Sequence, residues 1–88
     1  MDSYKLSLKP SAEKDLRKLP KAIVQRVLHI LEGLPAEPFP HNHSKLSGTE
    51  RLYRIRLGDY RIVYEVEEEA LAITVHSIRQ RQDAYRGV

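Results

Sequence analysis

The chain has 88 residues, of which 41% are hydrophobic and 31% charged, and this length fits one small domain spanning residues 1–88. It contains no cysteine, which excludes disulfides, thiol nucleophiles and cysteine-based zinc sites and is typical of a reducing cytoplasm. No apolar stretch approaches the roughly 20 residues that a membrane-spanning helix needs, and the N-terminus lacks a signal peptide's apolar run. We therefore expect a cytoplasmic protein with no membrane contact.

Positive charge is concentrated in two segments of the chain. The net charge is +3, but residues 51–61 carry +3 and residues 79–86 carry +2, which leaves −2 for the rest. This concentration favours contact with a polyanion at one place over a general affinity for acidic surfaces.

The N-terminal half predicts one strand followed by two helices. Residues 4–9 alternate apolar and polar side chains, as in a strand with one buried face. Ser11 can cap a first helix, which Pro20 interrupts. A second helix follows, with an apolar stripe that ends near Gly33 and Pro35.

The C-terminal half predicts three antiparallel strands after a proline-rich connecting loop over residues 35–49. The strands span about 51–57, 60–66 and 71–77, with turns at Gly58-Asp59 and at residues 67–69, and a last short helix begins near Gln80. The order β-α-α-β-β-β-α is that of a small α+β fold, in which a two-helix hairpin packs on a mostly antiparallel sheet.

The predicted hairpin separates apolar side chains from arginines. With the turn at Gly58-Asp59, alternate residues from Tyr53 to Val66 face the core, including tyrosines 53, 60 and 64. The opposite face collects Arg54, Arg56 and Arg61, with Arg56 directly across from Arg61. In the third strand we expect Leu71, Ile73 and Val75 to point into the core, which would place His76 beside Arg61.

Two interpretations of this arginine face remain open. It could be an ordinary solvated face, or an anion site, since the guanidinium stays charged and binds phosphate bidentately. Three residues of the C-terminal segment, Arg79, Arg81 and Tyr85, favour the second interpretation, because basic side chains with an aromatic ring at their edge are typical of single-stranded RNA recognition. Lys45, Arg51 and His76 are further candidates for contact with RNA.

Two other patterns have simpler explanations. His41 and His43 could be metal ligands, but a proline-rich loop lacks the spacing of a preformed site, so we expect ordinary loop histidines and no metal cofactor. The two helices around Pro20 could suggest a DNA-binding helix-turn-helix, yet a packing hairpin explains their pattern.

The sequence resembles the RelE branch of the RelE/ParE superfamily of toxin–antitoxin systems. The resemblance covers nearly the whole chain and rests on Lys45-Leu46-Ser47-Gly48, on the run from Leu52 to Tyr64, and on the ending with Arg79, Arg81 and Tyr85-Arg86. It implies a ribosome-dependent endoribonuclease that cuts mRNA in the ribosomal A site without a metal. It also implies a cognate antitoxin that wraps and neutralises the toxin, with a heterotetramer as one arrangement.

The resemblance also implies roles for individual residues. Arg54 and Arg56 match paired basic positions that are lysines in some relatives, and Arg61 matches the arginine of the second hairpin strand. Arg79 matches a further arginine by spacing from Tyr85, although Arg81 lies close enough to be the equivalent. Tyr85 matches the aromatic residue that stacks on the substrate base.

One departure affects the expected mechanism. Both lysine positions are arginine here, and a group with a pKa above about 12 is a poor general base. Tyr85 and His76 are the alternative candidates for this role. Two other functions also stay open: a ParE-like inhibitor of DNA gyrase, and an RNA-binding module without catalysis.

Overall fold

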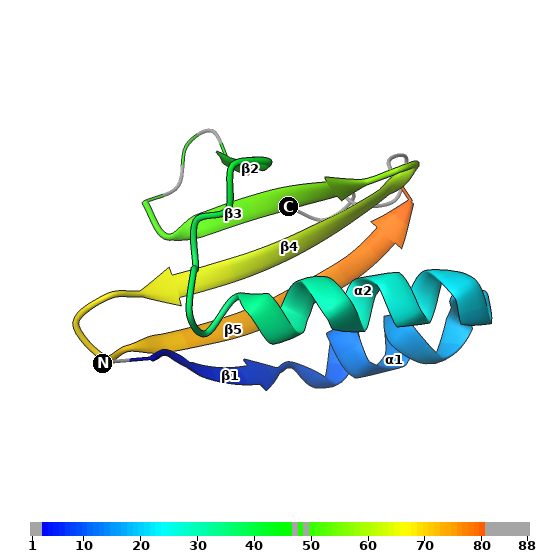
Figure 1. Cartoon of the computed structure of the whole chain (residues 1–88), viewed down its shortest axis with the longest axis horizontal. Coiled ribbons are helices and arrows are strands. Elements are labelled where there is room, and N and C mark those ends of the chain that lie inside the picture. The colour runs from blue at the N-terminus through cyan, green and yellow to red at the C-terminus, as the bar shows by residue number, and fades with distance from the viewer. Residues whose placement is uncertain (1–2, 47, 49, 81–88) are drawn as a thin grey trace.

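The computed structural model describes residues 3–46, 48 and 50–80, which form two helices and one five-stranded sheet (Figure 1). The N-terminal half contains strand β1 (Lys5–Leu8) and helices α1 (Pro10–Lys18) and α2 (Lys21–Gly33). Proline at the first position of α1 has no N–H, so it removes one of the backbone donors that would lack an intrahelical partner there, and Pro20 separates the two helices. The predicted strand and helical hairpin are confirmed. The expectation that Ser11 caps the first helix is wrong, because Lys9 is the N-cap residue of α1 and no side-chain cap hydrogen bond is formed among the residues that the structure describes. Neither helix within the described ranges is long and apolar enough to cross a bilayer.

The remaining strands are β2 (His43–Lys45), β3 (Leu52–Leu57), β4 (Tyr60–Glu67) and β5 (Ala72–Gln80). Their order in the sheet is β1-β5-β4-β3-β2, and only β1 and β5 run parallel. The α+β class is confirmed, with two differences. A short strand lies in the segment expected to be loop, and β5 continues through Gln80, where a helix was expected to begin. The rest of that predicted helix lies outside the described residues.

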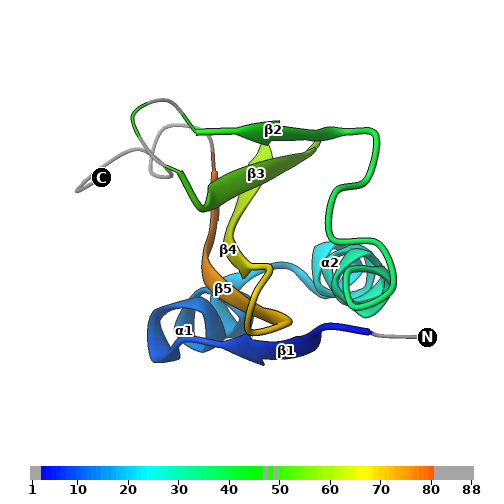
Figure 2. The same cartoon turned by 90° about the vertical axis from the view of Figure 1, so that its left-hand side faces the viewer.

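The sheet is strongly curved, and α2 lies in its opening (Figure 2). In the same view β2 and β1 lie at opposite ends of the curved surface. The core between sheet and helices consists of buried apolar side chains from α1, α2 and alternate positions of β3, β4 and β5: Ala12, Val27, Leu31, Leu34, Ile55, Leu57, Ile62, Tyr64, Val66, Ile73, Val75 and Ile78. The alternation therefore directs the side chains between these positions to the outer face of the sheet.

A one-residue bulge interrupts the pairing of β4 with β5. Tyr64 pairs with Val75 but Val63 pairs with Ser77, so His76 is the extra residue on β5. Beyond the bulge the faces of β5 exchange, which buries Ile78 in the core and places Arg79 on the outer face. In a continuous register Arg79 would instead face the core.

The expectation that Leu71 belongs to the core is wrong. Its side chain is 37% exposed and its φ of +51° places it in the turn before β5. The β5 residues that do face the core near this turn are Ile73 and Val75, both fully buried.

Candidate nucleic-acid interface

Three arginines lie side by side on the outer face of three adjacent strands. Arg61 of β4 pairs directly with Arg56 of β3 and with Arg79 of β5. Directly paired residues of antiparallel strands project to the same face, which here is the face away from the core. We call these three residues the arginine row. Since like charges opposite one another on a sheet repel, the row is not explained by sheet stability.

Arg61 at the centre of the row is buried, with 3% of its surface exposed. One terminal nitrogen donates hydrogen bonds to the carbonyl oxygens of Tyr60 at 3.0 Å and Gly58 at 3.3 Å. Its Nε is buried without a hydrogen-bond partner within the described part of the chain. A solvated arginine face was one interpretation of the sequence, but the central guanidinium is largely removed from water. Among the described residues no carboxylate is paired with Arg61, and burying an unpaired cation costs free energy, so this position favours a nearby negative charge.

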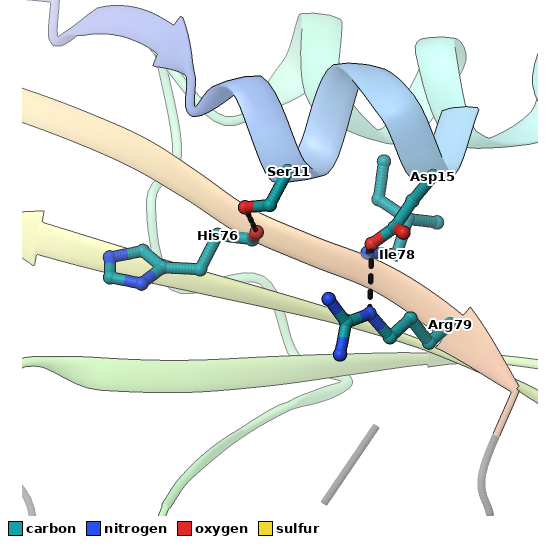
Figure 3. Close-up of polar contacts among 5 residues, drawn as sticks. All are labelled: Ser11, Asp15, His76, Ile78 and Arg79. Carbon is teal, nitrogen blue, oxygen red and sulfur yellow. Dashed lines mark hydrogen bonds and ion pairs between the residues drawn. The ribbon is translucent and has the colours of Figure 1, made fainter. Parts of the chain in front are cut away.

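Arg79 at one end of the row is held by a carboxylate from α1. Its Nε donates to Oδ2 of Asp15 at 3.1 Å, and the Arg79 side chain is 37% exposed (Figure 3). The other end of the row, Arg56, is exposed. The row therefore runs from an anchored cation through a buried one to a solvent-facing one.

Arg54 lies on the same outer face, one step along β3 from the row. It pairs with Val63 rather than with Arg61, and its Nε donates to Oγ of Ser44 on β2 at 2.9 Å. The hydroxyl of Ser44 thus fixes this guanidinium beside the row.

His76 is not beside Arg61, contrary to the expected register. Because it is the bulge residue, its Nε2 lies 2.9 Å from Oε1 of Glu65, two positions beyond Val63 on β4. The hydrogen bond from His76 lowers the pKa of the Glu65 carboxyl, partial burial opposes this shift, and the positive charge of Arg51 adds a smaller lowering. His76 and Arg51 therefore surround Glu65 at a distance from the arginine row.

Of three other predicted residues, one lies apart from the row and two lie outside the described residues. Lys45 is exposed on β2 and pairs with Tyr53, so it lies on the opposite face of the sheet from Arg54. Arg81 and Tyr85 lie outside the described residues, so their place relative to the row stays a prediction.

The predicted core tyrosines differ in their surroundings. Tyr64 is fully buried, its hydroxyl donates to the carbonyl oxygen of Pro38 at 2.8 Å, and burial raises its pKa well above the ordinary range. Tyr53 packs against Tyr64 with ring centroids 5.9 Å apart. Tyr60 instead lines an open groove of about 530 Å³ next to Arg79, together with Asp15, Lys18, Leu19, Ile78 and Gln80.

The loop histidine His43 belongs to an aromatic cluster. Its ring centroid lies 5.6 Å from that of Phe39 and 5.9 Å from that of Tyr53. Across the described ranges, no three histidine, aspartate or glutamate side chains gather as metal ligands would. The contacts of His43 are accounted for by packing.

Sequence reasoning missed the part that Asp15 plays at this site. Its carboxylate contacts Arg79 of β5, 64 residues away in the chain. A signal was available in the i, i+4 spacing of Ser11 and Asp15, which puts two short polar side chains on one side of the helix.

The fold and the arginine row together define a small basic α+β protein with three arginines side by side on its sheet, and comparisons with known proteins give its family. Residues 6–85 match the model of the ParE toxin of the type II toxin–antitoxin system parDE. The chain is 30% identical over 87 residues to toxin RelG of Mycobacterium tuberculosis, covering 94% of this chain and 97% of that one.

Solved structures agree with this match. The archaeal RelE–RelB complex of Pyrococcus horikoshii contains a chain that superposes with a TM-score of 0.81 at 36% identity, covering 93% of this chain and 99% of that one. The intact RelBE toxin–antitoxin complex of Escherichia coli gives a TM-score of 0.77 at 30% identity, covering 89% and 96%. The chain belongs to the RelE/ParE superfamily of type II toxin–antitoxin toxins, and its relatives identify it as a RelE-type toxin.

Proposed function

We propose that this toxin is a ribosome-dependent endoribonuclease that cleaves mRNA in the ribosomal A site and thereby inhibits translation. The observation that carries the proposal is the arginine row, with Arg61 buried between two other arginines and its Nε unpartnered within the described part of the chain. A phosphodiester placed there would supply the missing acceptor and the missing negative charge.

The chemistry is the attack of a ribose 2′-hydroxyl on the adjacent phosphate. The bond from the 2′-oxygen to phosphorus forms, the bond from phosphorus to the 5′-oxygen breaks, and the products are a 2′,3′-cyclic phosphate and a free 5′-hydroxyl. Arg56, Arg61 and Arg79, with Arg54 beside them, would stabilise the extra negative charge of the phosphorane and hold the linkage for in-line attack. No metal is required in this scheme.

Proton transfer falls to groups other than these arginines, which stay charged near neutral pH. His76 is bonded to Glu65 away from the row, which weakens its candidacy as the general base. Tyr85, with an ordinary pKa of about 10, is the stronger sequence candidate, and Arg81 would add positive charge near it.

We also propose a cognate antitoxin as the partner of this toxin. Two of the superposed structures are complexes of RelE with RelB, which supports a similar assembly here. Ribosome and mRNA complete the set of proposed partners.

In vitro translation with a primer-extension readout tests the proposal. The toxin should produce discrete breaks at fixed codon positions on translated mRNA and none on the same mRNA without ribosomes. Intact mRNA together with inhibited supercoiling by DNA gyrase would instead establish the ParE-like function. Binding of RNA with neither cleavage nor gyrase inhibition would establish a non-catalytic module.

A further inference from the structure

The carboxylate of Asp15 connects α1 to β5 at the arginine row. Its Oδ2 accepts a hydrogen bond from the backbone nitrogen of Ile78 at 3.0 Å and another from Nε of Arg79 at 3.1 Å. The Asp15 side chain is only 15% exposed, less than half the exposure of Arg79. One oxygen atom thus fixes both the edge of the strand and the side chain that projects from it (Figure 3).

The contact arises because α1 continues the line of β1 along β5, as Figure 1 shows. Strand β1 pairs with β5 only as far as Val75, so the next backbone groups of that edge need other partners. Ser11 Oγ donates to the carbonyl oxygen of His76 at 2.8 Å, and Asp15 accepts from Ile78. Four residues of a helix span about 6 Å along its axis, and two residues of a strand span about 6.6 Å. An i, i+4 pair of side chains on α1 can therefore reach backbone groups that lie two residues apart on β5.

The carboxylate holds Arg79 by a single nitrogen. A guanidinium carries five N–H donors, and Asp15 engages the one on Nε, nearest the side chain's stem. In Figure 3 the dashed contact with Asp15 ends on Nε, and the two terminal nitrogens of Arg79 lie to one side of it. A carboxylate bound to both terminal nitrogens would compete with a phosphate, whereas this contact orients the guanidinium and leaves its outer donors available.

We infer that Asp15 is a positioning residue, which holds the guanidinium of Arg79 in the arginine row for contact with an RNA phosphate. This inference rests on the proposed nuclease function and deepens it. It also assigns the phosphate contact to Arg79 rather than to Arg81, because Arg79 is the arginine that the strand register and Asp15 together fix beside Arg61.

The decisive variant is Asp15→Asn, which keeps a side-chain oxygen as acceptor but removes the negative charge that strengthens the contact with the Arg79 guanidinium. We expect its single-turnover cleavage rate on saturating ribosome complexes to fall about tenfold to a hundredfold. If Asp15→Asn acted only through its change of net charge, cleavage would not fall, because removing a negative charge beside a phosphate site strengthens RNA binding. In the Arg79→Ala background, Asp15→Asn should cause no further loss.

Two controls on the same helix separate positioning from structure. Glu13→Gln removes the same charge from α1, where Glu13 is exposed and lies 3.9 Å from Arg17. Ser11→Ala removes the other bond between α1 and the edge of β5 without touching Arg79. Both variants should cleave within twofold of the wild type. If Asp15→Asn did so too, or if Ser11→Ala were equally impaired, the positioning role would be overturned.

A second readout separates this inference from the proposed function. Solvent exchange of the Nε–H proton of Arg79, followed by NMR in the free toxin, should be faster in Asp15→Asn than in the wild type. If the wild type failed to cut mRNA, the nuclease proposal would fall, and this exchange rate would still decide whether Asp15 holds Arg79. An unchanged exchange rate would overturn the positioning role whatever the activity.

Discussion

At the scale of single residues, the position of Arg61 lowers the stability of the fold and is best explained by a role in binding. It is 3% exposed, flanked by two arginines on neighbouring strands, and bonded by its side chain to carbonyls of the adjacent turn. Each like-charge pair on a sheet costs a few tenths of a kcal/mol to about 1 kcal/mol, and a buried cation that has no carboxylate partner among the described residues adds to that cost. A residue kept there against these costs is expected to serve a ligand.

We predict that Arg61→Met does not destabilise the protein. Methionine has similar length and adapts to irregular space, so it fills the position while removing the repulsion with Arg56 and Arg79. Urea unfolding should give a free energy of unfolding equal to that of the wild type or up to about 1 kcal/mol higher. The exposed Arg56→Met is the matched control. A loss of more than about 2 kcal/mol in Arg61→Met would show that Arg61 is structural.

The pair of Glu65 and His76 makes a pH-dependent contribution to stability. Because the folded protein lowers the pKa of Glu65 below its ordinary 4.5, the unfolded chain takes up the proton first as the pH falls. The contribution is therefore complete above about pH 4.5 and is lost as the pH falls through the lower folded-state pKa. Both side chains are 23% exposed, so the expected size is under about 1 kcal/mol.

Glu65→Gln should flatten this part of the stability curve. The difference in unfolding free energy between wild type and variant, present near neutral pH, should shrink as the pH falls below about 4.5. Glu68→Gln, in the exposed turn after β4, is the control and should leave the curve unchanged. If the difference in unfolding free energy between the wild type and Glu65→Gln stayed constant from neutral to acidic pH, the hydrogen bond to His76 would not be what lowers the pKa of Glu65.

At the scale of elements, a turn and a bulge set the arginine row. Gly58 has a φ of +59° in the two-residue turn between β3 and β4, and this turn fixes Arg56 opposite Arg61. The bulge at His76 then brings Arg79 to the same face of the sheet. Both features change which face of the sheet a side chain occupies.

A pair of glycine variants tests the backbone requirement at the turn. No atom lies within 4 Å of an added Cβ at Gly58 or at Gly33, so neither substitution is limited by space. Gly58→Ala should lower stability by about 1 kcal/mol, because an L-residue is strained at positive φ. Gly33→Ala, at the end of α2, should raise stability by up to about 1 kcal/mol. Equal effects of the two in thermal unfolding would contradict this assignment of the turn.

At the scale of the whole molecule, the sequence was most informative where its periodicity was regular. Alternating residues predicted β3 and β4 and the opposition of Arg56 to Arg61, and helical spacing predicted α1 and α2. Strand β2 was missed because three residues in a proline-rich segment carry no detectable period. The parallel pairing of β1 with β5 was missed because alternation identifies a strand but not its neighbour.

The candidate site was only partly predictable, because local sequence patterns do not show which distant segments contact one another. The bulge was not predicted because the last strand was expected to end at Ser77. It is nevertheless visible in the sequence, because the apolar core residues Ile73 and Val75 are two positions apart whereas Val75 and Ile78 are three apart. The burial of Arg61 depends on tertiary packing, which no local pattern encodes. The contact of Asp15 with Arg79 depends on where α1 lies against β5.

The most direct test of the nuclease proposal compares Arg61→Met with the wild type in reconstituted translation, reading mRNA ends by primer extension. Lys14→Met, which removes the same charge from an exposed position on α1, is the control. Wild type and Lys14→Met should give the same codon-position breaks, and Arg61→Met, folded and soluble, should give none. Undiminished cleavage by Arg61→Met would contradict the assignment of the arginine row as the RNA-cleaving site.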